Sequence, residues 1–415
     1  MELGKILIVL ENNKGGKMNS IKKLNKAQLC VGCGICKAAL NDCVDLKLGE
    51  TGKFSIENTK DWTEENERIF KKLCPVLAPG AISDCMWGKT NGVFYGWSND
   101  VGVRYEASSG GIISQTLKYL LKKNMVDAVL HIEKDMENPL KNKAVVCTNE
   151  AEIMRGAGSR YAPAVLLEHL PQVLKTYKRV AVVGKPCDIR AVKNYASERN
   201  EIADRIVYTF SFFCGGVPSE KASVRVVEKL GGKLNDLLDI SYRGNGWPGY
   251  ASITTKNGDV LQMSYVDSWG KILGRDIHRY CKFCVDGLSE LADFTCGDGW
   301  YETESGYPSH EEHDGRNIIL VRTEKGKKLL NEMNIAGEIS LDPITDYEAV
   351  LNNIQPGQLA RRQILKARIV PMKIFKQYLP KYPMKCLRNW EKDVDKKYRL
   401  RVSLGTIKRL LKGTL

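Results

Sequence analysis

The residues of this sequence best suited to chemistry are its thirteen cysteines, in a chain of 415 residues. In an intracellular protein thiols are kept reduced, so this many cysteines indicate metal binding or redox chemistry rather than disulfide bonds. Three of them, Cys30, Cys33 and Cys36, form a C-x2-C-x2-C motif, and Cys74 is followed by Pro75. These four cysteines are the first candidate metal ligands.

The spacing of these four cysteines predicts a 4Fe–4S cluster. In bacterial-type ferredoxins three closely spaced thiolates bind three irons of the cluster, and a remote cysteine before a proline binds the fourth. Gly32 and Gly34 would let the backbone approach the inorganic sulfurs and turn its N–H groups toward them. A zinc site is the alternative.

Two more cysteines, Cys43 and Cys85, lie in the same stretch of the chain. Only six cysteines occur between residues 30 and 85, whereas a complete two-cluster ferredoxin needs about eight. One cluster therefore fits better than two. We interpret Cys43 and Cys85 as small buried apolar residues.

A second candidate set combines a C-x2-C pair with two single cysteines. Cys281 and Cys284 form the pair, a motif that zinc ribbons and redox dithiols share. Cys187 and Cys214 each follow a predicted strand, so three separate loops could converge on one four-thiolate site. Tetrahedral thiolate sets suit zinc or iron–sulfur centres, and the spacing leaves both open.

The elements that must position these cysteines are a small cysteine-rich unit and a longer run of alternating strands and helices. In the first unit a polar stretch at 61–72 predicts one helix ahead of Cys74. After a Gly-, Asn- and Ser-rich linker, Ser109-Gly110-Gly111 opens a helix with apolar residues on one side. The strands are expected at 126–132, 179–183, 206–213 and 317–322. Two of them end in cysteine-bearing loops, where α/β proteins place their chemistry.

A series of short motifs runs in order between about residues 90 and 330. They are Ser109–Gly111, Gly158–Tyr161, Gly184–Cys187, Phe213–Gly215, Ser241–Gly244, Cys281–Asp286, Ala292-Asp293, Gly297–Trp300 and Ile319–Gly326. Together these motifs resemble the family of coenzyme F420 hydrogenase/dehydrogenase beta subunits. With the ferredoxin-like head they cover about three quarters of the chain.

The resemblance implies an α/β domain that binds FAD next to a 4Fe–4S cluster and exchanges electrons with a deazaflavin, a ferredoxin or a partner subunit. Carried over, the ligands of this second cluster would be Cys187, Cys214, Cys281 and Cys284. Three residues differ from the pattern expected for this family. Arg160 occurs where Lys is expected, Asp188 where Gln is expected, and Cys296 where a small or apolar residue is expected.

The expected fold class is α+β and α/β, in three parts. Residues 18–87 form a ferredoxin-like 4Fe–4S domain, residues 90–335 an α/β domain for FAD and the second cluster, and residues 336–415 a basic helical region. A stretch rich in Lys and Gly precedes Met18, and we expect the native chain to begin at Met18 rather than at Met1.

The flavin would be held without the usual dinucleotide fingerprint, because the sequence contains neither GxGxxG nor a Walker loop. Ser109-Gly110-Gly111 at a helix start, and the turn at 156–160, would offer N–H groups to phosphates. Ordinary helix caps and tight turns are the alternative. The expected flavin contacts are Ser109, Gly110, Gly111, Ser159, Arg160, Tyr161, Lys185 and Asp298. Candidates for proton transfer are Tyr161, Lys185, His278 and Asp298, although a lone histidine is more often structural.

The net charge of +14 is concentrated at the end of the chain. Residues 361–415 contain 17 Lys and Arg but 3 Asp and Glu. Leu400, Leu404, Ile407 and Leu411 fall on one face of a predicted helix between basic residues, as in helices that lie on anionic membranes. Docking on the protein's own body or on a partner is the alternative. Nucleic acid is not expected, because interleaved aromatic residues are missing.

These features predict an iron–sulfur flavoprotein oxidoreductase that passes electrons between a ferredoxin or reduced deazaflavin donor and a small-molecule substrate. No apolar stretch approaches the roughly 20 residues of a membrane-spanning helix, and a cytoplasmic location, with possible attachment at the membrane surface, is expected. A non-catalytic electron-transfer subunit of a larger complex is the second hypothesis. A zinc-bound binding module without redox activity is the third.

Overall fold

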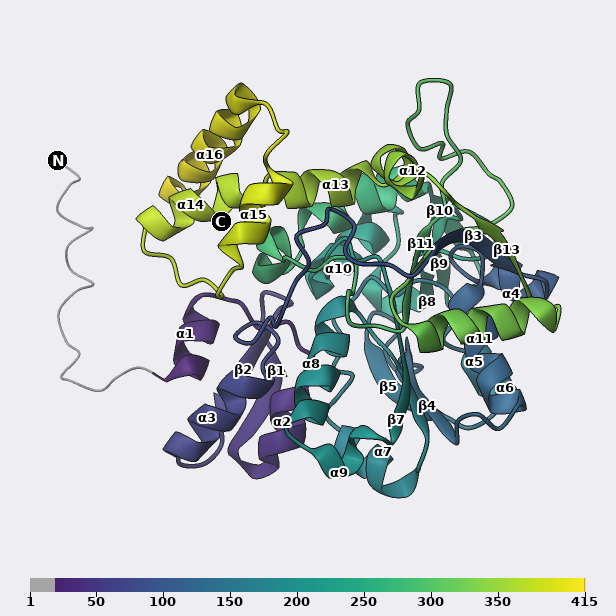
Figure 1. Cartoon of the computed structure of the whole chain (residues 1–415), viewed down its shortest axis with the longest axis horizontal. Helices are drawn as coiled ribbons and strands as arrows, with labels where there is room; N and C mark the ends of the chain where they lie inside the picture. Colours follow the sequence, from purple (N-terminus) through teal and green to yellow (C-terminus); the bar gives the residue numbers. More distant parts are fainter. Residues whose placement is uncertain (1–18, 414) are drawn as a thin grey trace.

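The computed structural model describes residues 19–413 and 415. The expected start at Met18 therefore lies outside the described residues. The chain folds into a cysteine-rich N-terminal unit, a large mixed sheet with helices on both faces, a small second sheet and a C-terminal group of helices (Figure 1). This arrangement confirms the expected mixed α/β fold class.

The N-terminal unit consists of three helices and one hairpin. Its elements are α1 (Ser20–Lys26), α2 (Ile35–Leu40), β1 (Val44–Leu48), β2 (Phe54–Asn58) and α3 (Glu64–Leu73). The predicted helix ahead of Cys74 is α3. It begins after Thr63 because the Thr63 side chain accepts a hydrogen bond from the backbone N–H of Asn66. Acidic residues in its first turn and lysines in its last complement the helix dipole.

Glu67 of α3 ties α1 to the rest of this unit. Its carboxylate accepts hydrogen bonds from Ser20 Oγ at 2.6 Å and Trp62 Nε1 at 2.9 Å, and it pairs with Lys71 at 2.8 Å. Burial raises the pKa of Glu67, but the hydrogen bonds from Lys71, Ser20 and Trp62 outweigh burial and lower the pKa from 4.5 to about 2. The carboxylate therefore stabilises the folded state above about pH 4.5, and this contribution is lost as the pH falls toward 2.

We expect Glu67→Gln to lower the free energy of unfolding by about 1–2 kcal/mol at neutral pH, after allowance for solvent screening. The difference from the unchanged protein should shrink as the pH falls from about 4.5 toward 2. Urea unfolding at several pH values measures it. Glu57→Gln, which removes an exposed pair with Lys47, is the control. A difference that persists undiminished near pH 2 would contradict the assignment.

The large sheet has eight strands in the order β13-β3-β12-β11-β7-β6-β4-β5. The strands are β3 (Val93–Ser98), β4 (Ala128–Lys134), β5 (Asn142–Cys147), β6 (Val180–Val183), β7 (Ile206–Phe212), β11 (Phe294–Asp298), β12 (Asn317–Val321) and β13 (Ile339–Pro343). The central strands β4, β6, β7 and β11 are parallel, and the flanking pairs are antiparallel. The four strands expected from the sequence are β4, β6, β7 and β12. Because β13 pairs with β3, the sheet extends past residue 335, where we expected this part to end.

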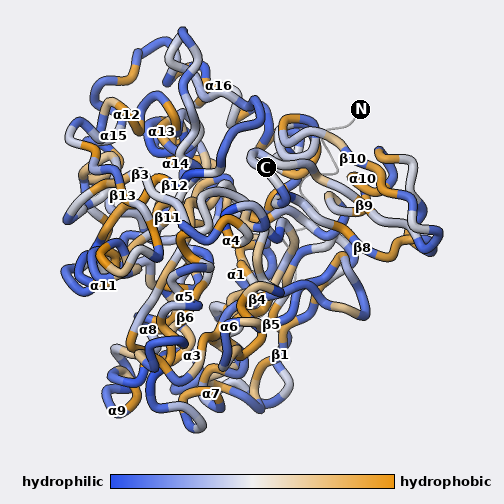
Figure 2. The backbone as a smooth tube through the Cα atoms, turned by 90° about the vertical axis from the view of Figure 1, so that its right-hand side faces the viewer, coloured by the Kyte–Doolittle hydropathy of each residue, from blue (hydrophilic) through white to orange (hydrophobic). Residues whose placement is uncertain are grey.

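Helices cover both faces of the large sheet. They are α4 (Val101–Glu106), α5 (Ile112–Lys122), α6 (Glu150–Met154), α7 (Leu170–Thr176), α8 (Pro186–Ser197), α9 (Asn200–Ala203) and α11 (Glu324–Ile335). Helix α10 (Glu220–Lys229) instead packs against the small second sheet. Side chains alternate along β6, so Val180 and Val182 pack on the face of α7 and α8, and Ala181 packs on the face of α5 and α11. Figure 2 shows apolar residues along these strands and hydrophilic residues along many outer turns.

One apolar core joins three parts of the chain. It contains Leu24 and Phe70 of the N-terminal unit, Val180 and Val182 of β6, and Leu387 of the C-terminal region. The N-terminal unit is therefore packed directly against the α7 and α8 side of the sheet. This contact fixes the position of the first cysteine set relative to the loops that carry the second.

Two further groups complete the fold. A three-stranded antiparallel sheet, which the sequence did not reveal, contains β8 (Leu237–Ser241), β9 (Ala251–Thr255) and β10 (Val260–Met263). The C-terminal helices are α12 (Tyr347–Ile354), α13 (Pro356–Gln363), α14 (Leu365–Ile374), α15 (Met384–Trp390) and α16 (Lys396–Leu411). Among the residues that the structure describes, no helix has the length and apolar character needed to cross a membrane.

Candidate redox site

The first four cysteines meet in the interior of the N-terminal unit. Cys30, Cys33, Cys36 and Cys74 are buried and line one small cavity of about 20 Å³, whose other walls are mainly apolar side chains from α1, α2, α3 and the hairpin. Gly34 precedes α2 in the left-handed region, at φ 89°. A β-carbon at Gly34 would lie 2.8 Å from the backbone nitrogen of Glu168. Only glycine therefore allows this turn to lie so close to the neighbouring segment.

Backbone N–H groups point at these sulfurs. Gly32, Ile35 and Lys37 provide hydrogen bonds to the thiols of Cys30, Cys33 and Cys36, and Val76 and Leu77 provide them to Cys74. Burial raises the pKa of each thiol, to about 12 for Cys30 and about 11 for Cys74. Four thiolates in this cavity therefore need a positively charged centre to be stable. The donors present fit an iron–sulfur cluster.

The second set of cysteines comes together from three loops. Cys187 lies in the first turn of α8 after β6, and Cys214 follows β7. Cys281 lies within a short helical turn at Arg279–Phe283, and Cys284 directly follows that turn. Burial raises the pKa of Cys187, and the nearby Cys214 and Cys281 raise it further. Burial likewise raises the pKa of Cys281 to about 12, with contributions from Cys214 and Cys284. The backbone N–H of Val217 donates to Cys281 Sγ at 3.4 Å.

A site for a single metal ion is a different matter from a cluster site. Within residues 19–413, no group of three or more His, Cys, Asp or Glu side chains is placed to hold one metal ion. In a cubane cluster each thiolate bonds an iron atom of its own.

A buried ion pair lies between the two cysteine sets. Lys185 Nζ and Asp188 Oδ1 are 2.6 Å apart, and both side chains are almost fully buried. Burial raises the pKa values of Cys30, Cys33, Cys187 and Cys214, and the charge of Lys185 partly offsets this effect at all four. Burial alone would lower the pKa of Lys185, but the Asp188 carboxylate outweighs it and raises the pKa. The charge of Lys185 thus favours the thiolate form of cysteines in both sets.

His278 also connects the two sets. Its Nδ1 lies 3.3 Å from the carbonyl oxygen of Cys30, and its own carbonyl accepts a hydrogen bond from the N–H of Cys281 at 3.0 Å. Burial lowers the pKa of His278 to about 4. The imidazole is therefore neutral at physiological pH and is placed as a structural contact between the sets. Its buried Nε2 has no hydrogen-bond partner within the described part of the chain.

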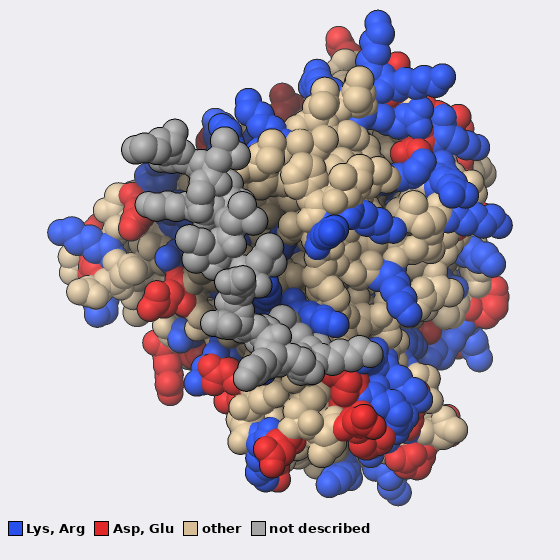
Figure 3. Space-filling view, turned by 90° about the vertical axis from the view of Figure 1, so that its left-hand side faces the viewer, with Lys and Arg blue, Asp and Glu red and all other residues tan. Residues whose placement is uncertain are grey.

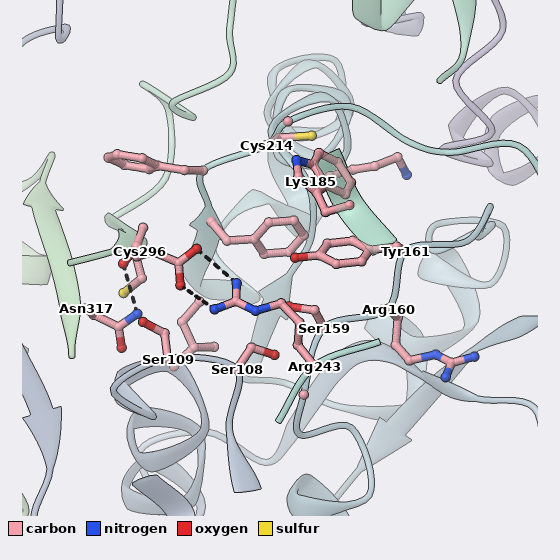
Figure 4. Close-up of a pocket in the computed structure, with 18 of the residues that line it drawn as sticks. Ser108, Ser109, Ser159, Arg160, Tyr161, Lys185, Cys214, Arg243, Cys296 and Asn317 are labelled. Atoms are coloured by element: carbon pink, nitrogen blue, oxygen red, sulfur yellow. Dashed lines mark hydrogen bonds and ion pairs between the residues drawn. The ribbon is translucent and has the colours of Figure 1, made fainter. Parts of the chain in front are cut away.

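A large pocket of about 690 Å³ opens beside the second cysteine set (Figure 4). Its volume lies in the range of small-molecule and cofactor sites. Seven of the eight expected flavin contacts line it: Ser109, Gly111, Ser159, Arg160, Tyr161, Lys185 and Asp298. Cys214 and Asp188 line it as well. Gly110 lies behind the wall, where a β-carbon would be 2.5 Å from the carbonyl oxygen of Gly96.

The N-terminus of α5 forms one wall of this pocket. The N–H of Ile112 donates to Asn317 Oδ1 at 3.2 Å, and Ser109 Oγ donates to the carbonyl oxygen of Arg316 at 2.7 Å. Ser108, which we did not select from the sequence, has a buried hydroxyl without a hydrogen-bond partner in the described residues. The helix dipole and this unused hydroxyl suit a phosphate or another polar ligand group.

The buried Arg243 and the half-buried Asp298 form an ion pair in the same pocket. Arg243 Nη1 and Nη2 donate to the two carboxylate oxygens of Asp298, each at 2.9 Å (Figure 4). Trp247 Nε1 also donates to Asp298 Oδ1, at 3.1 Å. The guanidinium lies over the Tyr265 ring, 4.8 Å from its centroid. The Asp298 carboxylate thus serves to hold Arg243. Arg243 stands in the Ser241–Gly244 motif, but its type alone did not single it out.

Arg160 and Tyr161 diverge from one another. The Arg160 guanidinium donates to Asn142 Oδ1 at 2.8 Å and to the carbonyl oxygens of Ile240 and Pro139 at 2.9 and 2.7 Å, away from the pocket (Figure 4). The Tyr161 ring packs against Trp269, with centroids 4.7 Å apart. Within this turn Tyr161 presents its ring to the pocket, while Arg160 fixes the loop.

The C-terminal region adds contacts that the sequence did not suggest. Arg361 Nη1 and Gln358 Nε2, both from α13, donate to the carbonyl oxygen of Cys214 at 2.8 and 3.0 Å. Burial raises the pKa values of Cys214, Cys281 and Cys284, and the Arg361 charge opposes this rise at each. The sequence did not single out Arg361, because it is one of many basic residues in the predicted C-terminal region.

Cys43, Cys85 and Cys296 lie apart from the two sets. Cys43 is half-buried next to Asn66, Cys85 is exposed, and neither lines either cavity. The interpretation of Cys43 and Cys85 as buried apolar residues is therefore wrong, because both side chains are in contact with solvent. Cys296 is buried in β11, where it belongs to an apolar core and also borders the large pocket.

Comparison with known proteins gives a consistent result along the middle of the chain. Residues 93–171 match the family model described as coenzyme F420 hydrogenase/dehydrogenase, beta subunit N-term, and residues 177–347 match the model for the C terminus of the same subunit. Together the two matches cover more than half of the chain.

Several curated proteins are similar to this chain. The chain is 27% identical to the coenzyme F420 hydrogenase subunit beta of Methanococcus voltae, over 66% of this chain and 91% of that protein. It is 26% identical to the F420-dependent formate dehydrogenase subunit beta of Methanocaldococcus jannaschii, over 71% of each chain. It is 24% identical to a subunit of the F(420)H(2) dehydrogenase of Methanosarcina mazei, over 80% of this chain and 89% of that protein.

A solved structure with a similar fold is a chain of the F420-reducing NiFe hydrogenase complex from Methanosarcina barkeri. The TM-score is 0.54 and the sequences are 20% identical, over 73% of this chain and 100% of that chain. At this identity the likeness concerns the fold.

Proposed function

Because this chain belongs to the family of coenzyme F420 hydrogenase/dehydrogenase beta subunits, we propose that it is an iron–sulfur flavoprotein oxidoreductase. It passes electrons between a ferredoxin or reduced deazaflavin donor, two 4Fe–4S clusters, FAD and a small-molecule substrate. The family is one of oxidoreductase subunits. The cofactors, the donor and the substrate are the parts that we add.

The observation that carries this proposal is the position of the Lys185–Asp188 pair relative to the three candidate sites. Lys185 and Asp188 border the large pocket, and the Lys185 charge acts on thiols of both cysteine sets. Cys214 belongs to the second set and also lines the pocket. Electron transfer between centres requires that they lie close together, and this arrangement supports a series from the first set through the second to the pocket.

The residues assigned to each group follow from these contacts. Cys30, Cys33, Cys36 and Cys74 would hold the first cluster, and Cys187, Cys214, Cys281 and Cys284 the second. Ser108 and the N-terminus of α5 would bind a phosphate of FAD, and Tyr161 would pack against it. When bound, FAD supplies the conversion between hydride transfer and single-electron transfer. Lys185, held by Asp188, keeps a positive charge between the sets, which stabilises added electrons.

A non-catalytic electron-transfer subunit is the second candidate. It is favoured by the names of the relatives, which are subunits of hydrogenases and dehydrogenases. The purified chain alone decides between the two. Oxidation or reduction of a small substrate without any partner would support the enzyme, whereas activity that needs an added protein would support the subunit.

We expect anaerobic purification to yield a brown protein with about eight iron and eight sulfide per chain, four of each for every cluster, and about one FAD. Iron and sulfide analysis, flavin extraction and a visible spectrum measure this. About four iron atoms would remove the second cluster from the proposal. A colourless protein that contains zinc would reject it in favour of a zinc-bound module.

A further inference from the structure

Helix α16 presents an apolar stripe to solvent. Leu400, Leu404 and Leu411 are 60%, 56% and 73% exposed. Their spacing of four and seven residues places them on one helical face, and Ile407, half-buried, falls between them on the same face. An apolar stripe of this kind normally packs against the body of the protein, but here it does not.

A neighbouring face of α16 is the one that docks. Thr406 is fully buried, Ser403 Oγ donates to the carbonyl oxygen of Ala367 on α14 at 3.0 Å, and Arg399 pairs with Glu391 at 3.2 Å. The helix is thus held by a face other than the leucine stripe, with α14 as its main neighbour. Among the residues that the structure describes, the leucine stripe does not dock on the protein's own body.

Exposed basic residues border the stripe. They are Lys396, Lys397, Arg401, Lys408 and Lys412. Within the described part of the chain none of these five has an acidic ion-pair partner. Figure 3 views the side of the molecule where α14 and α16 lie, and its upper part shows many more Lys and Arg than Asp and Glu around a broad uncharged area. The neighbouring helix α14 and its end add exposed Val370, Ile374 and Phe375.

We propose that α16 binds an anionic lipid surface, parallel to the membrane plane. The leucines enter the boundary between headgroups and acyl chains, and the basic residues contact lipid phosphates and carboxylates. An amphipathic helix with basic residues beside its apolar face has the charge and shape complementary to such a surface. A protein partner fits less well, because it would have to place an acidic side chain opposite each of the unpaired basic residues.

The location of this surface separates it from the redox site. The stripe lies on the solvent side of α16, whereas the cysteine sets and the large pocket lie in the interior, lined in part by α13. Membrane binding would therefore hold the protein at the surface while the pocket stays open to its ligands. The proposal does not depend on the identity of the cofactors.

Vesicle flotation with the full-length protein tests the proposal. Vesicles of phosphatidylcholine with phosphatidylserine should bind the protein, vesicles of phosphatidylcholine alone should bind it much less, and added salt should weaken binding. The triple variant Leu400→Gln, Leu404→Gln, Leu411→Gln should reduce the bound fraction at least tenfold. Ile335→Gln, on α11 and 86% exposed, is the matched control and should bind like the unchanged protein.

A second variant guards against loss of folding in the first. Lys397→Gln, Arg401→Gln, Lys408→Gln and Lys412→Gln together remove charge but keep the leucines, and binding to anionic vesicles should again fall at least tenfold. Equal binding to neutral and anionic vesicles, or unchanged binding by both variants, would overturn the proposal. So would the absence of vesicle binding together with a stable protein complex that the leucine variant disrupts.

Discussion

Replacement of Cys33 with Ala is expected to reduce the iron content of the anaerobically purified protein by about half, from about eight to about four atoms per chain. Cys33 lies among four buried thiols that share one cavity, so loss of one ligand leaves a coordination position that no other described side chain in the cavity can fill. The flavin content should not change, because the large pocket is a separate cavity. Iron analysis and flavin extraction measure both.

The second cysteine set should respond in a different way. Cys281→Ala should also remove about four iron atoms, but it should in addition slow the reduction of the flavin by electrons that enter through the first cluster. Cys43→Ala and Cys85→Ala are controls that should retain all the iron, because neither side chain borders either cavity. Full iron content in Cys33→Ala would reject the assignment of the first set.

Replacement of Asp298 with Ala should lower the free energy of unfolding by about 3 kcal/mol, since it leaves the Arg243 charge buried without its partner. Arg243 is 3% exposed and Asp298 19% exposed. Asp298→Asn should cost less, because it keeps an acceptor for Arg243 and for Trp247. Urea unfolding of the flavin-free protein measures the difference.

The control for this prediction is another Asp–cation pair at the surface. Asp267 and Lys271 are 2.6 Å apart but largely exposed, so Asp267→Ala should change the free energy of unfolding by less than about 0.5 kcal/mol. A loss in Asp298→Ala no larger than in this control would show that Arg243 is stabilised by Tyr265 and by solvent rather than by Asp298.

The strands that carry the cysteines could be predicted because they are central and parallel. Such strands are buried on both faces, so Val180–Val183 and Ile206–Phe212 stand out as apolar runs, each ending at a loop with a cysteine. The small sheet of β8, β9 and β10 was missed because its strands are partly exposed and contain no continuous apolar run. Its alternation of apolar and polar residues is correspondingly weak.

The sequence could predict only those residues of the candidate site that belong to motifs with a recognisable local spacing. The C-x2-C-x2-C motif and the α5 turn are local patterns, and the structure brings their residues together as expected. The pairing of Arg243 with Asp298 and the contact of Arg361 with Cys214 depend on packing between segments distant in the sequence. The hydroxyl that stays free for a ligand belongs to Ser108, because the Ser109 hydroxyl donates to the carbonyl oxygen of Arg316. No local pattern predicts which of the two hydroxyls makes this hydrogen bond.

The apolar core that runs from Leu24 through Val180 to Leu387 means that the cysteine-rich head is not an exchangeable module. Cleavage in the linker near residue 90 would not release an independent small electron carrier. Release of the head would uncover the apolar face of the sheet against which the head packs. The N-terminal unit, the large sheet and the C-terminal region are therefore parts of one packed body. In the cell, a chain lacking any one of them would expose enough apolar surface to be recognised by chaperones and proteases.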